Sequence, residues 1–236
     1  MDDIQKAIER LTRFDRHSLF RWLRSNWELS DDFVSEALPA AYGAPPEARY
    51  MSVEEYLAFE ETSTLRHEYV AGQVFAMSGV TVGHNRIMDN VVAAFNGHFG
   101  NGPCHASSAG IKVHVRIGQD ECYYYPDVTV ICYPTTGEEK FVSPKLMVEV
   151  LSPSTENIDR REKAQNYRHV DSLEEYVIVA QKEREVTISR RSENWNSTIV
   201  KAPNAVAEFR SIGLALPLER IYAGVQMSSV LAVSAA

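Results

Sequence analysis

The stretches YPDVTV (residues 125–130) and LMVEVLS (residues 146–152) decide the fold of this chain. Each is a short apolar run that predicts a buried strand, and each carries one carboxylate, Asp127 or Glu149. A charged side chain in such a run needs a partner or a metal ion to offset its desolvation. Glu149 alternates with the valines beside it, so both acids share one face if the strands are neighbours. The pair therefore predicts a divalent-metal site, because a cation between the acids relieves their repulsion.

A structural role for the two acids is the alternative interpretation. Asp127 would then be a turn residue, and Glu149 would be a partner in an ordinary ion pair. The candidate partners of Glu149 are Lys145, Arg116 and Lys163.

The composition is that of a globular protein with room for a large core. The chain has 236 residues and a net charge of −8 at pH 7, which disfavours nonspecific adhesion to nucleic acid because such binding neutralises phosphates. The apolar runs fall short of a membrane span, and charges occur throughout the N-terminus, so we expect a cytoplasmic protein without a membrane partner. Cys104, Cys122 and Cys132 form no C-x-x-C pair, which predicts reduced, buried thiols.

The pattern of apolar residues predicts an α/β fold with a small N-terminal helical extension. Helical spacing over residues 1–44 indicates the extension, and the main domain is expected over residues 50–225, beginning at a capping box at Ser52. Helices are expected after Ser52, over residues 82–99 and over residues 156–169, with a frayed tail from residue 226. A hairpin is expected around Ala71-Gly72, and further strands over residues 104–117, 122–133, 145–151, 174–180, 185–191 and 195–200. This order predicts a mixed central β-sheet flanked by helices.

Several motifs between residue 51 and about residue 180 combine into a family pattern. They are MSVEEYL (51–57), HEYVAGQVFAMS (67–78), His84 at a helix start, YPDVTV (125–130), VEVLSPST (148–155), Lys163 with Tyr167, and EEYVIV (174–179). In these motifs the chain resembles the Uma-two family, a bacterial group with the restriction-endonuclease-like fold of the PD-(D/E)xK nucleases. The resemblance implies a metal-dependent DNA endonuclease that hydrolyses phosphodiester bonds with Mg²⁺ or Mn²⁺. It also implies that Asp127 and Glu149 are metal ligands and that Glu68 is an additional acid at the metal or its waters.

One position departs from the general nuclease pattern. Leu151 lies two residues after the second acid, where the pattern has a lysine on the same face of the strand. Lys163, one helical turn before Tyr167, is our preferred replacement, and Lys112 is the other candidate. In the alternative interpretation Lys163 is a solvated helix residue paired with Asp159.

Three further features have a functional and a structural interpretation. His84 would contact a phosphate or orient water, or it would be a structural or capping residue. The tyrosines of residues 123–125 would stack on bases or pack in the core. Arg160 and Arg161 would contact a DNA backbone or form a solvated helix face.

The leading hypothesis is thus a DNA endonuclease with a displaced lysine. The competing hypothesis is a catalytically inactive DNA-associated or protein-interaction module on the same fold, which the missing strand lysine would explain. A homodimer is compatible with either, because nucleases that cut both strands often pair two sites by two-fold symmetry.

Overall fold

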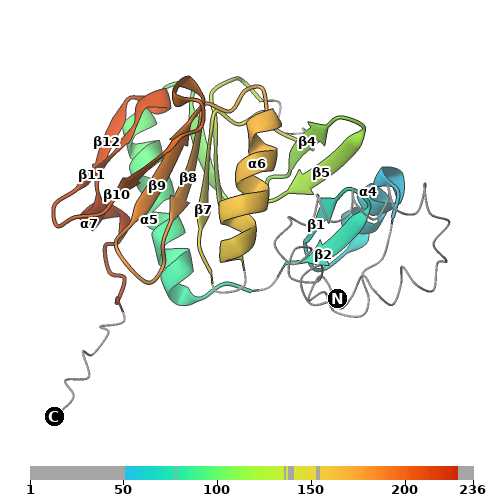
Figure 1. Ribbon diagram of the computed structural model, residues 1–236, viewed down its shortest axis with the longest axis horizontal. Helices are drawn as coiled ribbons and strands as arrows, with labels where there is room; N and C mark the ends of the chain where they lie inside the picture. Colours follow the sequence, from blue (N-terminus) through green and yellow to red (C-terminus); the bar gives the residue numbers. More distant parts are fainter. Residues whose placement is uncertain (1–50, 78, 136, 138–140, 153–154, 228–236) are drawn as a thin grey trace, which may run out of the picture. The chain divides into compact units, whose positions relative to one another are not determined.

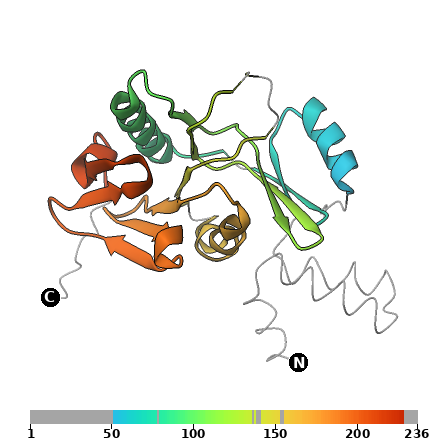
Figure 2. The ribbon, with the colours of Figure 1, turned by 90° about the horizontal axis from the view of Figure 1, so that it is seen from above.

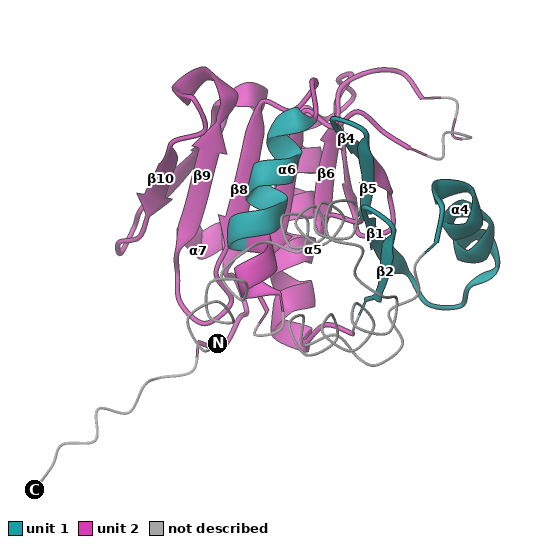
Figure 3. Ribbon diagram, turned by 45° about the vertical axis from the view of Figure 1, so that its right-hand side comes forward, with its two compact units in different colours: residues 1–78, 114–124, 160–169 teal, residues 79–113, 125–159, 170–236 magenta. Residues whose placement is uncertain are grey.

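A computed structural model of the protein describes residues 51–77, 79–135, 137, 141–152 and 155–227 (Figure 1). The chain divides into two compact units, each assembled from separate stretches of sequence (Figure 3). Unit 1 comprises residues 1–78, 114–124 and 160–169, and unit 2 comprises residues 79–113, 125–159 and 170–236. The predicted extension over residues 1–44 lies outside the described residues, as does the tail from residue 228. The domain boundaries at residues 50 and 225 stay a prediction.

Unit 1 contains a four-stranded sheet with the order β2, β1, β5, β4. The predicted capping box begins its first helix, since Ser52 Oγ accepts from the Glu55 N–H and the Glu55 carboxylate accepts from the Ser52 N–H. The predicted hairpin is also present, and its turn holds Ala71 and Gly72 at positive φ, as such turns require. The elements of unit 1 are α4 (Val53–Thr62), β1 (His67–Val70), β2 (Gln73–Ala76), β4 (Val113–Ile117, from its second residue), β5 (Asp120–Tyr124), α6 (Ala164–Asn166) and η2 (Tyr167–His169).

Aromatic side chains form the core of unit 1. The Tyr56 ring lies 4.9 Å from the Tyr69 ring and 5.5 Å from the Tyr123 ring, measured between centroids. The Tyr56 hydroxyl donates to the backbone oxygen of His67 at 2.7 Å, which satisfies the polar end of a fully buried ring. Tyr123 is therefore a packing residue, as the structural interpretation of the tyrosine run predicts.

Unit 2 contains a six-stranded mixed sheet with the order β10, β9, β8, β7, β6, β3. β7 and β8 run parallel, and the other neighbours run antiparallel. The mixed sheet with helices confirms the predicted fold class. The elements of unit 2 are α5 (Val82–Phe99), β3 (His105–Ser108), β6 (Val128–Ile131), β7 (Leu146–Val150), β8 (Glu175–Val179), β9 (Val186–Arg190), η3 (Arg191–Glu193), β10 (Ser197–Val200), β11 (Val206–Phe209), η4 (Arg210–Ile212), β12 (Leu214–Pro217) and α7 (Leu218–Ile221).

Helix α5 covers one face of this sheet, where it contacts β3, β6 and β7 (Figure 1). It also lies beside α7 and the hairpin β11–β12, as the view from above shows (Figure 2). Its buried side chains Ile87, Met88, Val91 and Phe95 follow the predicted helical spacing, and each contributes about 1.5–3 kcal/mol when fully buried. Val148 and Val150 of β7 belong to the same core, so the alternating Glu149 points to the other face of the strand.

Two predicted strands are in fact four. The segment predicted over residues 104–117 breaks at Gly110, whose φ of 113° no strand residue adopts, and gives β3 and β4. The segment predicted over residues 122–133 breaks at Tyr125-Pro126-Asp127 and gives β5 and β6, because Pro126 has no N–H for the ladder. The hairpin β11–β12 was not predicted at all. Each of its strands has only four residues, too few for a convincing alternation.

The helix predicted over residues 156–169 is helical but irregular. It passes from a π-helical segment, η1 (Ile158–Lys163), through the single α turn of α6 to the 3₁₀ turn η2. π-helical turns are rare and occur frequently at functional sites.

The prediction of reduced thiols is wrong for two of the three cysteines. Cys104 and Cys132 form a disulfide, and Cys122 is free and buried. The reason is the register of β3 and β6: His105 pairs with Ile131, so the residues just outside this pair lie opposite each other. The sequence separation of 28 residues gives no sign of this proximity. Among the described residues, no helix has the length and apolar character needed to cross a bilayer.

Candidate active site

Asp127 and Glu149 are neighbours across the pairing of β6 and β7. The register pairs Val128 with Val148, so Asp127, one residue before β6, lies opposite Glu149. Each carboxylate accepts a hydrogen bond from the other segment's backbone: Asp127 Oδ2 from the N–H of Val150 at 2.7 Å, and Glu149 Oε2 from the N–H of Asp127 at 3.4 Å. Glu149 is buried, and the Asp127 side chain is 14 % exposed. Unit 2 thus brings the two acids predicted to bind metal to one place.

His84 joins this pair from the first turn of α5. Thr81 is the N-cap of the helix, and its hydroxyl accepts from the His84 N–H at 3.2 Å, so His84 itself is not the cap. The imidazole is turned inward and is 3 % exposed, with Nε2 3.2 Å from Asp127 Oδ2. His84 was not among the predicted site residues, although its place at a helix start in the family pattern was an available signal.

The donors in this part of unit 2 suit a divalent cation. Carboxylate oxygens are the ligands that Mg²⁺ and Mn²⁺ prefer, and within the described ranges Oδ1 of Asp127 accepts no hydrogen bond. Neither ring nitrogen of His84 has a hydrogen-bond partner in the described part of the chain, although both are buried. Across the same ranges, no three His, Cys, Asp or Glu side chains already converge as ligands of one ion. The types of donor therefore fit a divalent ion, but the described side chains do not converge on one point.

Glu68 and Lys163 form a buried ion pair in unit 1. Glu68 lies on β1, Lys163 ends η1, and Lys163 Nζ is 2.7 Å from Glu68 Oε1. Their side chains are 10 % and 5 % exposed, so Lys163 is not the solvated helix residue of the alternative interpretation. The four predicted site residues are thus found as two pairs, one in each unit.

Tyr124 connects Lys163 with two polar residues that are not among the predicted site residues. Lys163 Nζ lies 5.7 Å from the centroid of the Tyr124 ring. The Tyr124 hydroxyl donates to Glu162 Oε1 at 3.1 Å and accepts from the side-chain amide of Asn166 at 2.7 Å. The Tyr167 ring packs edge-on against Tyr124 at 5.3 Å. The available signal in the sequence was that Glu162 and Asn166, one residue before and three residues after Lys163, are four residues apart, which places them on one side of a helix.

The other cations named in the sequence analysis have different surroundings. Lys112 Nζ lies 5.6 Å from the Tyr125 ring and 5.9 Å from the Phe141 ring. Lys145 pairs with Glu174, and Arg116 pairs with Glu121. Leu151 is buried, as expected of an apolar residue in place of the pattern's lysine. Arg160 and Arg161 are both exposed.

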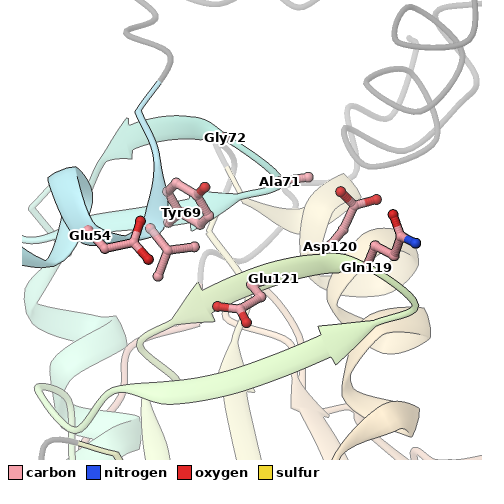
Figure 4. Close-up of a pocket in the computed structure, with 8 residues that line it drawn as sticks. Glu54, Tyr69, Ala71, Gly72, Gln119, Asp120 and Glu121 are labelled. Atoms are coloured by element: carbon pink, nitrogen blue, oxygen red, sulfur yellow. The ribbon is translucent and has the colours of Figure 1, made fainter.

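A separate pocket of about 320 Å³ lies in unit 1 (Figure 4). Its wall carries three carboxylates, those of Glu54, Asp120 and Glu121, together with the ring of Tyr69. None of the four predicted site residues lines it. Three acids around one hollow disfavour a phosphate, so this pocket is not a suitable place for a nucleic-acid backbone.

Comparison with known proteins extends this picture. The chain is 34 % identical over 178 residues to the uncharacterized protein slr1290 of Synechocystis sp., a match that covers 74 % of this chain and 92 % of that protein. It is 27 % identical over 167 residues to the uncharacterized protein sll1609 of the same organism, covering 68 % of this chain and 93 % of that protein. In three dimensions it is similar to a crystal structure from Anabaena variabilis described as "a putative nuclease belonging to DUF820". That likeness has a TM-score of 0.61 and 16 % identity and covers 73 % of this chain and 97 % of the other, so it concerns the fold alone.

The family pattern recognised in the sequence is confirmed over most of the chain. The sequence model of the Uma2 family, described as "Putative restriction endonuclease", matches residues 53–219 and so includes both acid-bearing segments and the Lys163 helix. The chain belongs to the Uma2 family.

Proposed function

We propose that this protein is a metal-dependent DNA endonuclease. Asp127 and Glu149 hold Mg²⁺ or Mn²⁺, Glu68 assists, and Lys163 supplies the cationic group. The observation that carries the proposal is the reciprocal hydrogen bonding that fixes the Asp127 and Glu149 carboxylates side by side. Buried acids held next to each other repel, and a cation is the natural means of relieving that repulsion.

Each residue has a role that follows from its surroundings. The N–H of Val150 fixes Oδ2 of Asp127, which leaves Oδ1, an oxygen that accepts no hydrogen bond within the described ranges, as the ligand. Glu149 Oε2 accepts from the N–H of Asp127 over a long 3.4 Å contact, and this carboxylate is the second ligand. A bound divalent ion supplies charge neutralisation at the phosphate and a water of lowered pKa.

Lys163 contributes the positive charge that Leu151 cannot. Its ammonium lies 2.7 Å from Glu68 Oε1 and 5.7 Å from the centroid of the Tyr124 ring, and both neighbours help to hold it in a buried place. A positioned ammonium stabilises the negative charge that develops on a phosphate during hydrolysis. Glu68 thereby acts on the reaction by orienting Lys163.

The substrate of the proposed reaction is DNA, although the protein carries a net charge of −8. Exposed cations therefore have to bind DNA locally, and Arg160 and Arg161 are exposed within the helical segment that carries Lys163. Such a site binds DNA weakly at high salt, because each contact with a phosphate releases counterions from the DNA.

The test combines cleavage with metal binding on the full chain. Supercoiled plasmid and short single-stranded and duplex oligonucleotides are incubated with the protein in Mg²⁺, Mn²⁺ or EDTA, and metal binding is measured by calorimetry. We expect metal-dependent cleavage that Asp127→Asn abolishes together with calorimetric binding. Glu174→Gln is the matched control, because it removes an exposed carboxylate paired with Lys145 and leaves the proposed site intact.

The results separate the hypotheses. Absence of cleavage with any metal, together with absence of metal binding that depends on Asp127, would refute the endonuclease and favour the inactive module. If Asp127 and Lys163 serve one reaction, the double variant Asp127→Asn/Lys163→Met loses no more activity than the worse single variant. Loss in Lys112→Ala without loss in Lys163→Ala would reassign the lysine.

A further inference from the structure

The imidazole of His84 is a buried polar group of unit 2 that makes no hydrogen bond to the described residues. It is 3 % exposed, and both ring nitrogens are buried without a hydrogen-bond partner among the described residues. A buried polar group left in this state costs about 1–3 kcal/mol. His67 provides a contrast, because its Nδ1 forms a hydrogen bond with Glu60 Oε2 at 2.9 Å, as is usual for a structural histidine.

The nearest charged atom to His84 is Asp127 Oδ2, 3.2 Å from Nε2. Although the two atoms are this close, they do not form a hydrogen bond, since Nε2 is among the buried atoms without a hydrogen-bond partner. Two ligands of one ion that lie at right angles, each about 2.1 Å from it, are about 3.0 Å apart. Nε2 therefore lies about one ligand spacing from the Asp127 carboxylate, whose other oxygen, Oδ1, accepts no hydrogen bond within the described ranges and is the one left for the ion.

We infer that His84 is a third ligand of the divalent ion, through Nε2, beside Asp127 and Glu149. This inference rests on the proposed function, because it takes the two acids as ligands. In the described structure the three side chains do not converge on one point. For all three to bind one ion, the Glu149 carboxylate has to turn, which breaks the 3.4 Å contact between its Oε2 and the N–H of Asp127. Coordination of the ion by Nε2 then removes the free-energy cost of burying an imidazole without a hydrogen bond. This gain favours ion binding.

A nitrogen ligand changes which ion the site selects. Mg²⁺ strongly prefers oxygen ligands, whereas Mn²⁺ accepts both carboxylate and imidazole, and affinity for such mixed sites rises further toward Co²⁺ and Ni²⁺. We therefore expect the protein to bind Mn²⁺ more tightly than Mg²⁺. Two carboxylates alone would give a much smaller preference.

The direct test is pulsed electron paramagnetic resonance of the Mn²⁺-loaded full chain. We expect a nitrogen coupling from a coordinated imidazole, which changes when the protein is labelled with ¹⁵N-histidine and is lost in His84→Asn. Calorimetry with Mn²⁺ alone and Mg²⁺ alone should show that His84→Asn lowers Mn²⁺ affinity at least about tenfold and Mg²⁺ affinity far less. His105→Asn, at an exposed histidine on β3, is the matched control and should leave both unchanged.

The outcomes distinguish the inference from the function it rests on. Mn²⁺ that binds in dependence on Asp127 without any imidazole coupling overturns the role of His84 and leaves the endonuclease proposal standing. Failure of Mn²⁺ to bind overturns both. The resonance measurement on the unaltered protein needs no variant, so a His84→Asn protein that fails to fold does not prevent the decision.

Discussion

Replacing Lys163 with methionine is the perturbation that examines the ion pair of unit 1 most directly. The side chains keep similar length, but the ammonium that lies 2.7 Å from Glu68 Oε1 is gone. Glu68 is then a carboxylate, 10 % exposed, without the cation that faces it. We expect a large loss of stability, because breaking one partner of a buried pair leaves the other charge desolvated.

The size of the effect follows from burial. Removing one partner of a buried pair costs about 3–5 kcal/mol, and the exposures of 5 % and 10 % place this pair in that class and not among surface pairs worth less than about 1 kcal/mol. For a chain of this length, each kcal/mol lowers the melting temperature by about 2–4 °C. Lys163→Met should thus lower it by about 6–20 °C.

The assay is a double-mutant cycle read by thermal and urea unfolding. The variants are Lys163→Met, Glu68→Gln and the two combined, with Lys163→Arg as the control that keeps the charge. We expect the double variant to be more stable than the sum of the single losses predicts, by about 2–3 kcal/mol, because neither charge is then left unpaired.

Two results would refute this reasoning. If Lys163→Met and Glu68→Gln are additive, the contact between them contributes no coupling, and Glu68 has no orienting role for Lys163. If Lys163→Met lowers the melting temperature by less than about 2 °C, the pair behaves as a solvated one, and the buried environment described for it is wrong.

Three further predictions concern residues outside the proposed site. Tyr222→Phe should cost about 1–3 kcal/mol by urea unfolding, since the buried hydroxyl lies 2.9 Å from Ala180 O and 2.8 Å from Glu185 O and accepts from the Glu185 N–H; an unchanged midpoint would contradict this. Glu175→Gln should lower stability by about 3 kcal/mol, because it removes one charge of the buried pair with Arg190, and it should leave the metal affinity measured by calorimetry unchanged. Loss of metal binding in a folded Glu175→Gln protein would contradict a purely structural role for Glu175. Burial lowers the pKa of His114 below 6.5, so the unfolded chain takes up the proton more readily, and the free energy of unfolding should fall as the pH drops below about 6.5. Melting curves between pH 7.5 and 5 should show a smaller decrease in melting temperature for His114→Gln. An equal decrease would exclude this histidine as the cause.

Much of the fold was predictable because local signals agreed with one another. The capping box at Ser52, the turn at Ala71-Gly72 and the apolar period of residues 82–99 each specify an element by themselves, and all three are present as predicted. The failures occurred where the deciding interaction is distant in the sequence. The Cys104–Cys132 disulfide depends on the register of β3 with β6, which no local pattern contains.

Part of the candidate site's geometry was predictable for the same reason. Asp127 and Glu149 were identified because a carboxylate in an apolar strand is conspicuous, and the structure places them together. His84 was not placed in the predicted site, because the sequence does not reveal the surroundings of its ring. A histidine at a helix start is ordinary until its ring is found buried beside a carboxylate with neither nitrogen hydrogen-bonded in the described residues.

An acid in a buried strand is nevertheless not enough to identify a metal ligand, and the neighbouring strand shows why. Glu175 begins β8, is 1 % exposed, and has both oxygens occupied: Oε1 accepts from Arg190 Nε at 2.8 Å and from the Arg210 N–H at 2.9 Å, and Oε2 accepts from the N–H and hydroxyl of Ser211 at 3.0 and 2.6 Å. Its desolvation is offset within the fold, so it has no need of an ion. Asp127 differs, because Oδ1 accepts no hydrogen bond within the described ranges and the side chain is partly exposed. The discriminating property is therefore the unused acceptor capacity of the carboxylate, which the apolar pattern of a strand cannot reveal.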